Sequence, residues 1–487
     1  MGVVLAIDAG TTGVRTMAFD EESRVVARSY RELTQYYPRP GWVEHDAAEI
    51  RDAVWATLAD VAGRVGPVAA VGITNQRETV VAWDTASGEP LHRAIVWQDR
   101  RTADRCAELT AAGHLDTVRR RTGLVLDPYF SATKMEWLLG PGGVERSANL
   151  ALGTVDAWLI WNLTGELVTD VSNASRTLVF DIRERRWDPE LAELFGVPLD
   201  ALPEVRASSG HLGATGPDGP LPPGVPVSGV AGDQQAALFG QACFGEGTTK
   251  NTYGTGSFVL MNVGDACPEP VEGLLTSVAW ELADGSAAYA LEGSIFVTGA
   301  ALQWLRDGLA IVDHVAEIGP LAGSVESAEG LYFVPALAGM GSPYWDPTAR
   351  GVIVGITNGS GRAQLARAAV DAMAHQTRDV VEAMTAATGQ PARTMRVDGG
   401  AAVMDLLLQV QADQLGAPVG RPVITETTSL GAAWLAGLGT GVWSSLDELE
   451  GLWTLDAEFH PAPDRTVADA AHQGWVRAVG RARSWAR

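Results

Sequence analysis

The residues best suited to chemistry lie in one stretch, residues 228–258. Asp233 follows a glycine there and opens the apolar run 236–239, and residues 251–258 read NTYGTGSF, a Gly/Thr-rich turn with no bulk at its tip. A carboxylate can accept a proton from a hydroxyl group, and small residues let backbone N–H groups and threonine hydroxyls come close to a polyphosphate. Together the two pieces predict phosphoryl transfer to an alcohol, although either piece alone also suits a strand, turn or hairpin of an ordinary core.

A second Gly/Thr turn lies near the N-terminus. Residues 3–9 form an apolar run, residues 10–13 read GTTG, and a second apolar run follows to residue 20, which predicts a hairpin whose tip could hold phosphate. The Gly-Thr pairs at 10–11 and 254–255 lie about half the chain apart, so each half opens with the same device. This repetition predicts a duplicated two-domain kinase with ATP between its halves.

The totals exclude several classes of protein. A chain of 487 residues is long enough for two domains, each with its own core. The net charge of −23 argues against a nucleic-acid or anionic-membrane partner. Three widely spaced cysteines predict neither a disulfide framework nor a zinc site, and we find no signal peptide and no apolar span, so a reducing cytoplasm is expected.

Lysine is almost absent from this chain. Lys134 and Lys250 stand among 36 basic residues that are otherwise all arginine. A lysine presents a compact ammonium where a planar guanidinium does not fit, so both positions are candidates for a special role. Survival by chance is an equal alternative.

The first half predicts a helix and a strand that deliver polar groups to one edge. Residues 46–66 form an apolar stripe of helical period, with Asp46 as N-cap and Glu49 completing a capping box. Residues 68–74 then predict a buried strand whose carboxyl end is followed by residues 75–79, including Arg77 and Glu78, where α/β sheets place ligand groups. A guanidinium beside a carboxylate suits neighbouring hydroxyl groups, although a surface ion pair would look the same.

Three further segments complete the first half. Residues 94–102 predict a strand that contains Trp97, either a wall for a small ligand or a core residue. Residues 123–138 predict a loop that carries Tyr129 into a helix, and residues 155–161 predict another helix. The Pro/Gly-rich residues 210–225 predict an exposed loop.

The second half repeats the theme. Residues 290–307 predict a strand that becomes a helix at Gly299, and residues 363–385 predict a long amphipathic helix. Residues 394–400 predict a strand that runs into two glycines before a helix over 401–415, a turn on which a nucleotide can lie. The Gly/Ala-rich residues 430–441 predict a helix packed tightly in the core.

These residues resemble the FGGY carbohydrate-kinase family of the sugar kinase/Hsp70/actin superfamily, in particular its members that phosphorylate glycerol. The likeness runs nearly end to end. Its most specific pieces, in the family's order, are GITNQRET at 72–79, IVWQDRRT at 95–102, GLVLDPYFSATK at 123–134, GDQQAALFGQ at 232–241, NTYGTGSF at 251–258 and PYWDPTARG at 343–351, with GVIVGITNGSGRAQLARAAVD at 351–371 similar to the family's second signature.

The resemblance implies an α/β fold of two actin-like (ribonuclease H-like) ATPase domains, residues 1–242 and 243–487, with the active site in the cleft between them. It implies ATP- and Mg²⁺-dependent phosphorylation of glycerol to sn-glycerol 3-phosphate, the first step of glycerol catabolism, by a homo-oligomer (dimer or tetramer). Asp233 would be the general base. The other glycerol-binding residues would be Arg77, Glu78, Trp97, Tyr129, Gln234 and Phe258; the nucleotide residues Thr11, Thr12, Gly13, Arg15, Thr255, Gly299, Gln303, Gly400 and Met404; and the magnesium residue Asp8.

Two departures from the family's pattern stand out. Met404 occupies a position where the family usually has Asn, which puts an adenosine-side hydrogen bond in doubt. Residues 210–225 lack the Gly-Thr-Arg element through which some bacterial relatives bind fructose 1,6-bisphosphate, so that inhibition is not expected. The alternatives are a kinase for another small polyol or ketose, a protein-binding actin- or Hsp70-like ATPase, and a weakly active relative.

Overall fold

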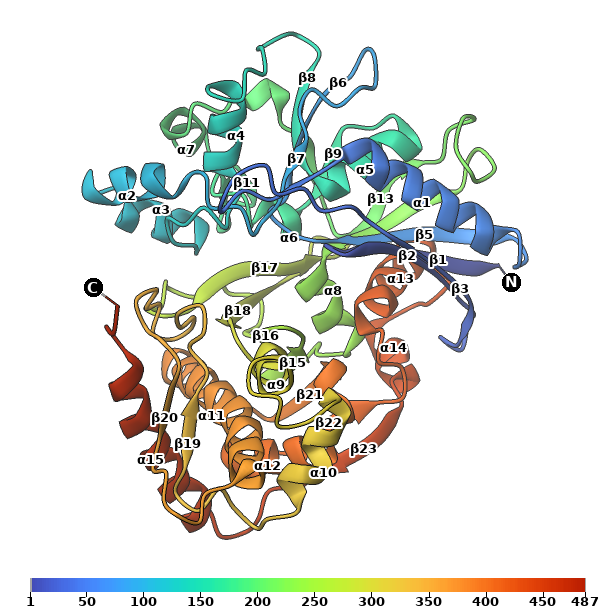
Figure 1. Cartoon of the computed structure of the whole chain (residues 1–487). Helices are drawn as coiled ribbons and strands as arrows, with labels where there is room; N and C mark the ends of the chain where they lie inside the picture. Colours follow the sequence, from blue (N-terminus) through green and yellow to red (C-terminus); the bar gives the residue numbers. More distant parts are fainter. Residues whose placement is uncertain (1, 487) are drawn as a thin grey trace.

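Two mixed sheets, one built by each half of the chain, organise the molecule (Figure 1). The computed structural model describes residues 2–486. The first sheet has the strand order β13 (Ser209–Ala214), β14 (Pro226–Gly232), β5 (Val68–Asn75), β1 (Val3–Ala9), β2 (Gly13–Phe19) and β3 (Val25–Glu32). The second has the order β17 (Leu275–Glu281), β18 (Ala287–Ile295), β16 (Ser257–Asn262), β15 (Thr248–Tyr253), β21 (Thr394–Gly399), β22 (Val419–Pro422) and β23 (Leu455–Phe459).

The two sheets share one pattern of pairing. In the first, β1, β2 and β3 are antiparallel, whereas β1, β5 and β14 run parallel. In the second, β15, β16 and β18 are antiparallel, whereas β15, β21 and β22 run parallel. The two Gly/Thr turns therefore close equivalent hairpins, β1–β2 and β15–β16. The predicted repetition is confirmed, and the predicted boundary between residues 242 and 243 stays a prediction.

Helices and smaller sheets complete the fold. The remaining strands are β4 (Glu44–His45), β6 (Val80–Asp84), β7 (Ala94–Ile95) and β8 (Leu150–Thr154) in one sheet, and the pairs β9 (Val168–Asp170) with β12 (Glu204–Arg206), β10 (Phe180–Asp181) with β11 (Arg186–Trp187), and β19 (Tyr332–Val334) with β20 (Val352–Val354). The helices are α1 (Ala47–Ala62), α2 (Ala103–Ala111), α3 (Leu115–Thr122), α4 (Ala132–Leu139), α5 (Val155–Thr164), α6 (Val171–Ala174), α7 (Pro189–Leu194), α8 (Asp233–Gly240), α9 (Gly299–Asp307), α10 (Ile318–Gly323), α11 (Arg362–Thr388), α12 (Asp405–Leu415), α13 (Thr427–Thr440), α14 (Leu446–Leu452) and α15 (Thr466–Ala482), with 3-10 helices η1 (Leu199–Ala201), η2 (Val315–Glu317) and η3 (Gly400–Val403).

Helices α8 and α13 lie between the two sheets (Figure 1). Helix α13 comes from the second half of the chain but packs on β1, β5 and β14 of the first sheet, and α8 contacts β15 and β16 of the second. The helices touch so closely that a Cβ atom at Gly240 would lie 2.0 Å from the carbonyl oxygen of Thr427. The predicted tight packing of the Gly/Ala-rich helix is confirmed, and it joins the two halves.

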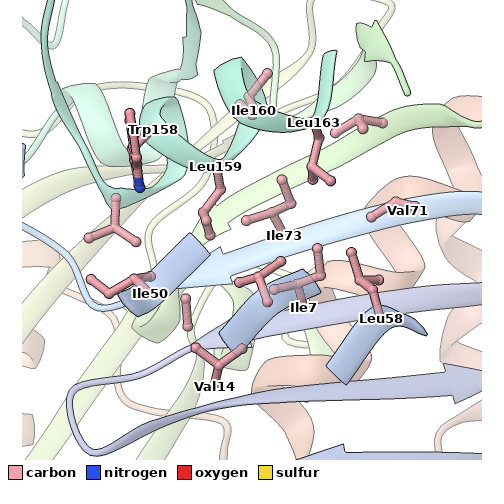
Figure 2. Close-up of a cluster of buried hydrophobic side chains, with 14 of the residues drawn as sticks. Ile7, Val14, Ile50, Leu58, Val71, Ile73, Trp158, Leu159, Ile160 and Leu163 are labelled. Atoms are coloured by element: carbon pink, nitrogen blue, oxygen red, sulfur yellow. The ribbon is translucent and has the colours of Figure 1, made fainter. Parts of the chain in front are cut away.

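The core beneath the first sheet follows from apolar periodicity. Strands β1 and β5 alternate residues toward α1 and α5, and each buried aliphatic side chain contributes about 1.5–3 kcal/mol. Figure 2 shows the residues that meet there: Ile7, Val14, Ile50, Leu58, Val71, Ile73, Trp158, Leu159, Ile160 and Leu163. Because this packing holds β1 and β5 rigidly, the polar residues at their ends have fixed positions.

Three local predictions need correction. Asp46 caps α1 by accepting from the backbone N–H of Ala48 at 2.9 Å, but Glu49 accepts from the hydroxyl group of Thr34, so the capping box is wrong. Only Ala94–Ile95 of the predicted strand 94–102 is extended, because the backbone then turns toward Asp99. Part of the predicted loop 210–225 is the edge strand β13, whose register with β14 is irregular.

Residues 2–486 contain neither a membrane-spanning helix nor a cluster of metal-ligating side chains. No helix there is long and apolar enough to cross a membrane. The same residues contain no group of three or more His, Cys, Asp and Glu side chains that could hold a metal ion.

Candidate functional site

Three parallel strands deliver the reactive candidates to one edge of the first sheet. Asp8 lies near the end of β1, Arg77 and Glu78 follow β5, and Asp233 is the first residue of α8, directly after β14. The carboxyl ends of neighbouring parallel strands meet at the same edge, which is where α/β proteins bind ligands. The structure therefore brings these four side chains together from three distant parts of the chain.

Asp233 combines exposure with a nearby positive charge. Its side chain is 32% exposed, whereas that of Arg77 is 1% exposed, and the Asp233 Oδ1 atom lies 3.1 Å from Arg77 Nε. The glycine before it is needed, because a Cβ atom at Gly232 would lie 2.6 Å from Arg77 Cγ. The carboxylate can thus receive a proton from a bound molecule while a buried guanidinium faces it.

A buried ion network holds Arg77 in place. Arg77 donates from Nη1 to Glu292 Oε2 at 2.6 Å and from Nη2 to Glu292 Oε1 at 3.1 Å. Arg176 donates to Glu78 at 2.6 Å and to Glu292 at 3.2 Å. Glu292 belongs to β18 of the second sheet, so this network ties the two halves together at the site.

Burial and the neighbouring charges together determine the pKa values of the carboxyl groups in this network. Burial by itself raises the pKa of Glu292, but the guanidinium groups of Arg176 and Arg77 bring it down to about 2. Burial dominates at Glu78, whose pKa lies above its ordinary value despite the two guanidinium groups. Glu78 also adopts a left-handed backbone with φ of 63°, which costs of the order of 1 kcal/mol outside glycine and often marks a functional position.

Sequence reasoning missed Arg176 and Glu292. Glu292 is the one charged residue in the buried strand β18, and a buried carboxylate needs a partner. That signal was available in the sequence, but the identity of the partner was not. Arg176 follows the short helix α6 and offers no comparable pattern.

Aromatic side chains surround Arg77. The Tyr129 hydroxyl group accepts from Arg77 Nη2 at 3.3 Å, and the rings of Tyr129 and Trp97 meet edge to face at 5.6 Å. Burial and the Glu78 carboxylate raise the pKa of Tyr129, which stays neutral. The Phe258 ring, from β16 of the second sheet, lies 5.8 Å from the Arg77 guanidinium. These rings provide apolar walls beside the polar cluster.

Lys134, one of the two lysines of the chain, supports this aromatic wall. Its side chain is fully buried, and its ammonium donates to the carbonyl oxygens of Pro128, Tyr129 and Phe130 at 2.9, 2.7 and 2.6 Å. Three carbonyl groups converging on one point suit the three donors of an ammonium. Lys134 therefore fixes the loop that carries Tyr129.

The first Gly/Thr turn, residues 10–13, is linked to the aromatic wall. Thr11, Thr12 and Gly13 form the tip of the β1–β2 hairpin, closed by the backbone N–H of Gly10 donating to the carbonyl of Gly13 at 3.0 Å. Trp97 donates from its indole N–H to the Thr11 hydroxyl group at 2.9 Å. Arg15 is the register partner of Asp8 across the hairpin. A cation and a carboxylate thus stand beside the first turn.

The second Gly/Thr turn, around Gly254 and Thr255, is linked to the N-terminus of α9. Gly254 donates to the carbonyl of Gly256 at 2.8 Å, and the backbone N–H groups of Thr298 and Ala300 both donate to the carbonyl of Thr255 at 3.0 Å. Gly299 begins α9 and donates to the carbonyl of Gly254 at 3.1 Å. The structure therefore brings Thr255 and Gly299 together, and the carbonyl groups of the turn accept from the first N–H groups of α9.

The remaining nucleotide candidates lie on the second half of the chain. Gln303 is on an exposed part of α9, one turn after its start. Gly400 begins η3, which contacts β15. Met404 precedes α12, is partly buried and packs against the core of this half, with its Cγ atom 3.2 Å from where a Cβ atom of Gly319 would stand. A thioether there offers no amide for hydrogen bonding.

The carboxylates suit one magnesium ion brought with a nucleotide. Burial raises the pKa of Asp8 to about 6, and the guanidinium of Arg15 opposes that rise. The charge of Asp233 adds to the rise in the Asp8 pKa. Magnesium is commonly held by one or two carboxylates together with substrate phosphates, which this donor set can supply.

Comparisons with known proteins cover the whole chain. Residues 3–240 match the N-terminal domain model of the FGGY family of carbohydrate kinases, and residues 249–440 match its C-terminal domain model. Glycerol kinase of Carboxydothermus hydrogenoformans is 51% identical over 492 residues, covering 99% of this chain and 98% of that protein. Glycerol kinase of Symbiobacterium thermophilum is 52% identical over 495 residues, covering 100% and 99%. The crystal structure of Plasmodium falciparum glycerol kinase with ADP has a TM-score of 0.94 at 34% identity, covering 99% and 98%, which confirms the predicted two-domain α/β fold.

Proposed function

The chain belongs to the FGGY family of carbohydrate kinases, and we propose that it transfers the terminal phosphoryl group of ATP to glycerol, giving sn-glycerol 3-phosphate. The observation that carries the proposal is the cluster of Arg77, Glu78 and Asp233 between two phosphate turns. Full-length identity of about half to proteins named glycerol kinase supports the same substrate.

Asp233 is the proposed general base. Its partly exposed carboxylate accepts the proton of the attacking hydroxyl group while the oxygen of that group bonds to the terminal phosphorus. The bond between that phosphorus and the bridging oxygen of ATP breaks, and ADP leaves with the electron pair. Phosphoryl transfer depends mainly on positioning and charge neutralisation, so one base between two fixed turns is sufficient protein machinery.

The acceptor is held by groups that match three neighbouring hydroxyls. Arg77 and Gln234 donate, Glu78 accepts, and Tyr129 can do both, while Trp97 and Phe258 cover the carbon atoms. A site built from buried polar groups rejects analogues that lack a hydroxyl, because its own groups would be left unpaired. The Arg77–Glu78 pair beside Trp97 favours a small triol as the acceptor.

The nucleotide is proposed to lie across both hairpins. Thr11, Thr12, Gly13 and Arg15 would bind phosphate oxygens from one side, and Thr255 with the start of α9 at Gly299 from the other. Gln303, Gly400 and Met404 would face the adenosine. Bound magnesium would neutralise phosphate charge beside Asp8.

The proposal is tested by ATP-dependent phosphorylation with the purified protein and Mg²⁺, comparing glycerol with dihydroxyacetone, erythritol, xylulose and no acceptor. We expect a strong preference for glycerol over the pentose. A preference for xylulose or erythritol would reassign the acceptor. ATP hydrolysis without any phosphorylated acceptor would overturn the proposal in favour of an actin- or Hsp70-like ATPase.

A further inference from the structure

Lys250 is a fully buried cation directly behind the proposed base. It lies on β15, its side chain has no exposed surface, and its ammonium donates to the side-chain oxygen of Gln234 and to the Thr252 hydroxyl group, the latter at 2.9 Å. Gln234 follows Asp233 on α8, and Thr252 stands two residues before the second phosphate turn. None of the roles proposed above uses this ammonium.

An ammonium can only donate, so it determines the direction of the neighbouring hydrogen bonds. Gln234 must present its oxygen to Lys250, which turns its NH₂ group the other way. The Thr252 oxygen accepts from Lys250, which leaves the Thr252 O–H free to donate elsewhere. A neutral hydrogen-bonding residue at position 250 could be satisfied with either orientation, whereas lysine permits one.

The surroundings keep the charge in place. Burial lowers the pKa of Lys250 to about 8, and the carboxylates of Asp398 and Asp233 oppose that change. The group therefore carries its proton at neutral pH. Asp398 is itself buried and accepts from Gln241 at 2.9 Å and from Thr427, so both carboxylates near Lys250 are fixed by α8 or α13.

Thr252 occupies a position in the second hairpin that is equivalent to that of Asp8 in the first. It lies two residues before Gly254 in the second hairpin, as Asp8 lies two residues before Gly10 in the first. Lys250 and Thr252 point to the same face of β15 because side chains alternate along a strand. The Thr252 hydroxyl therefore stands at the second turn where the Asp8 carboxylate stands at the first.

We propose that Lys250 is a positioning residue that orients the Gln234 amide as a donor toward the acceptor hydroxyl and the Thr252 hydroxyl as a donor toward the transferred phosphoryl group. This inference rests on the proposed glycerol phosphorylation and adds Thr252 to the residues that serve it. It also gives a reason for one of only two lysines to stand here, since the planar fork of a guanidinium would impose a different hydrogen-bond geometry.

The variant Lys250→Met keeps the length of the side chain and removes its donors and charge. We expect kcat/KM for glycerol to fall by about 100-fold, as when a preorganised donor is lost from an active site. The matched control is Arg396→Met, which removes the cation at the register partner of Lys250 on β21; Arg396 instead donates to the Gln241 carbonyl and lies 4.1 Å from the Trp453 ring. Its kcat/KM should stay within about threefold of the unmodified protein.

A double-mutant cycle separates positioning from mere packing. If Lys250 acts through its two neighbours, adding Lys250→Met to a Gln234→Leu, Thr252→Val background should cost much less than about 100-fold, since its targets are already gone. Equal losses in both backgrounds would overturn the inference. If Lys250→Met does not fold, the single variants decide: Gln234→Leu should raise KM for glycerol alone, and Thr252→Val should lower kcat alone, and failure of either split would refute the idea.

The same assay distinguishes this inference from the function on which it rests. An unmodified protein that phosphorylates no glycerol would overturn both. An active unmodified protein together with a fully active Lys250→Met variant would overturn the role of Lys250 and leave the proposed function standing.

Discussion

Replacing Glu292 by Gln should both destabilise the protein and weaken acceptor binding. Glu292 is fully buried on β18 and accepts two hydrogen bonds from Arg77 and one from Arg176. The amide of Glu292→Gln has nearly the shape of the carboxylate but no negative charge. The two buried guanidinium groups of Arg77 and Arg176 then lose the anion that neutralises them. The protein should lose the tie between its halves together with the orientation of Arg77.

The magnitude follows from the charges. A pKa lowered from 4.5 to about 2 corresponds to about 3 kcal/mol in favour of the ionised side chain. Removing one partner of a buried ion pair costs about 3–5 kcal/mol by direct measurement on other proteins. The two figures agree. For a domain that makes up about half of this 487-residue chain, such a loss lowers the melting temperature by about 5–10 °C.

The assay combines thermal unfolding with steady-state kinetics. We expect the lower melting temperature together with a KM for glycerol raised about tenfold or more, because the Arg77 guanidinium is no longer held in its orientation by Glu292. The control is Glu281→Gln on neighbouring β17, which removes a partly exposed ion pair with Arg185 at 3.2 Å and should cost less than about 1 kcal/mol. The reasoning would be refuted if Glu292→Gln behaved like this control in both measurements.

Three further variants test separate parts of the site and core. Asp233→Asn should lower kcat by about 10²–10⁴-fold while glycerol still binds in calorimetry, and unchanged turnover would reject Asp233 as the base. Trp97→Phe keeps an aromatic ring but loses the hydrogen bond from the indole N–H to the Thr11 hydroxyl group, so kcat/KM for MgATP should fall by up to about tenfold. Unaltered MgATP kinetics would show that this hydrogen bond does not position the first turn. Burial, assisted by the nearby Asp170 charge, raises the pKa of Asp156 from 3.8 to about 7, so the folded state binds this proton more tightly and loses stability as pH rises from about 4 to about 7. Asp156→Asn has no such proton to lose. Its free energy of unfolding, relative to that of the unmodified protein, should therefore increase by up to about 4 kcal/mol between pH 4 and pH 7 and then level off. A difference that does not change with pH would contradict the raised pKa of Asp156.

The sequence by itself determined the local parts of this protein. Both Gly/Thr turns, the strand that precedes Arg77, the start of α8 at Asp233 and the glycine end of β21 could be predicted. Each rests on small residues or apolar periodicity within a few positions. The resemblance to a family of kinases then supplied roles for these residues, and full-length similarity confirmed the fold.

Local patterns failed where neighbouring elements competed. Glu49 was predicted to complete a capping box, but its carboxylate is taken by Thr34, which lies close only after β3 has folded beside α1. The run after Ile95 has the composition of a strand, yet the chain bends because the buried Asp99 carboxylate accepts from the backbone N–H groups of Val43 and Arg101. Tertiary hydrogen bonds outweigh a weak strand propensity.

Only the tertiary structure decided how the buried charges pair. Glu292 meets Arg77 across 215 positions of sequence, and Lys250 meets Gln234 through the packing of α8 on β15. The sequence marks each of these groups as unusual, since an unpaired charge cannot be buried. Which partner neutralises it depends on which sheet edges and helices come together, and residue spacing carries no record of that.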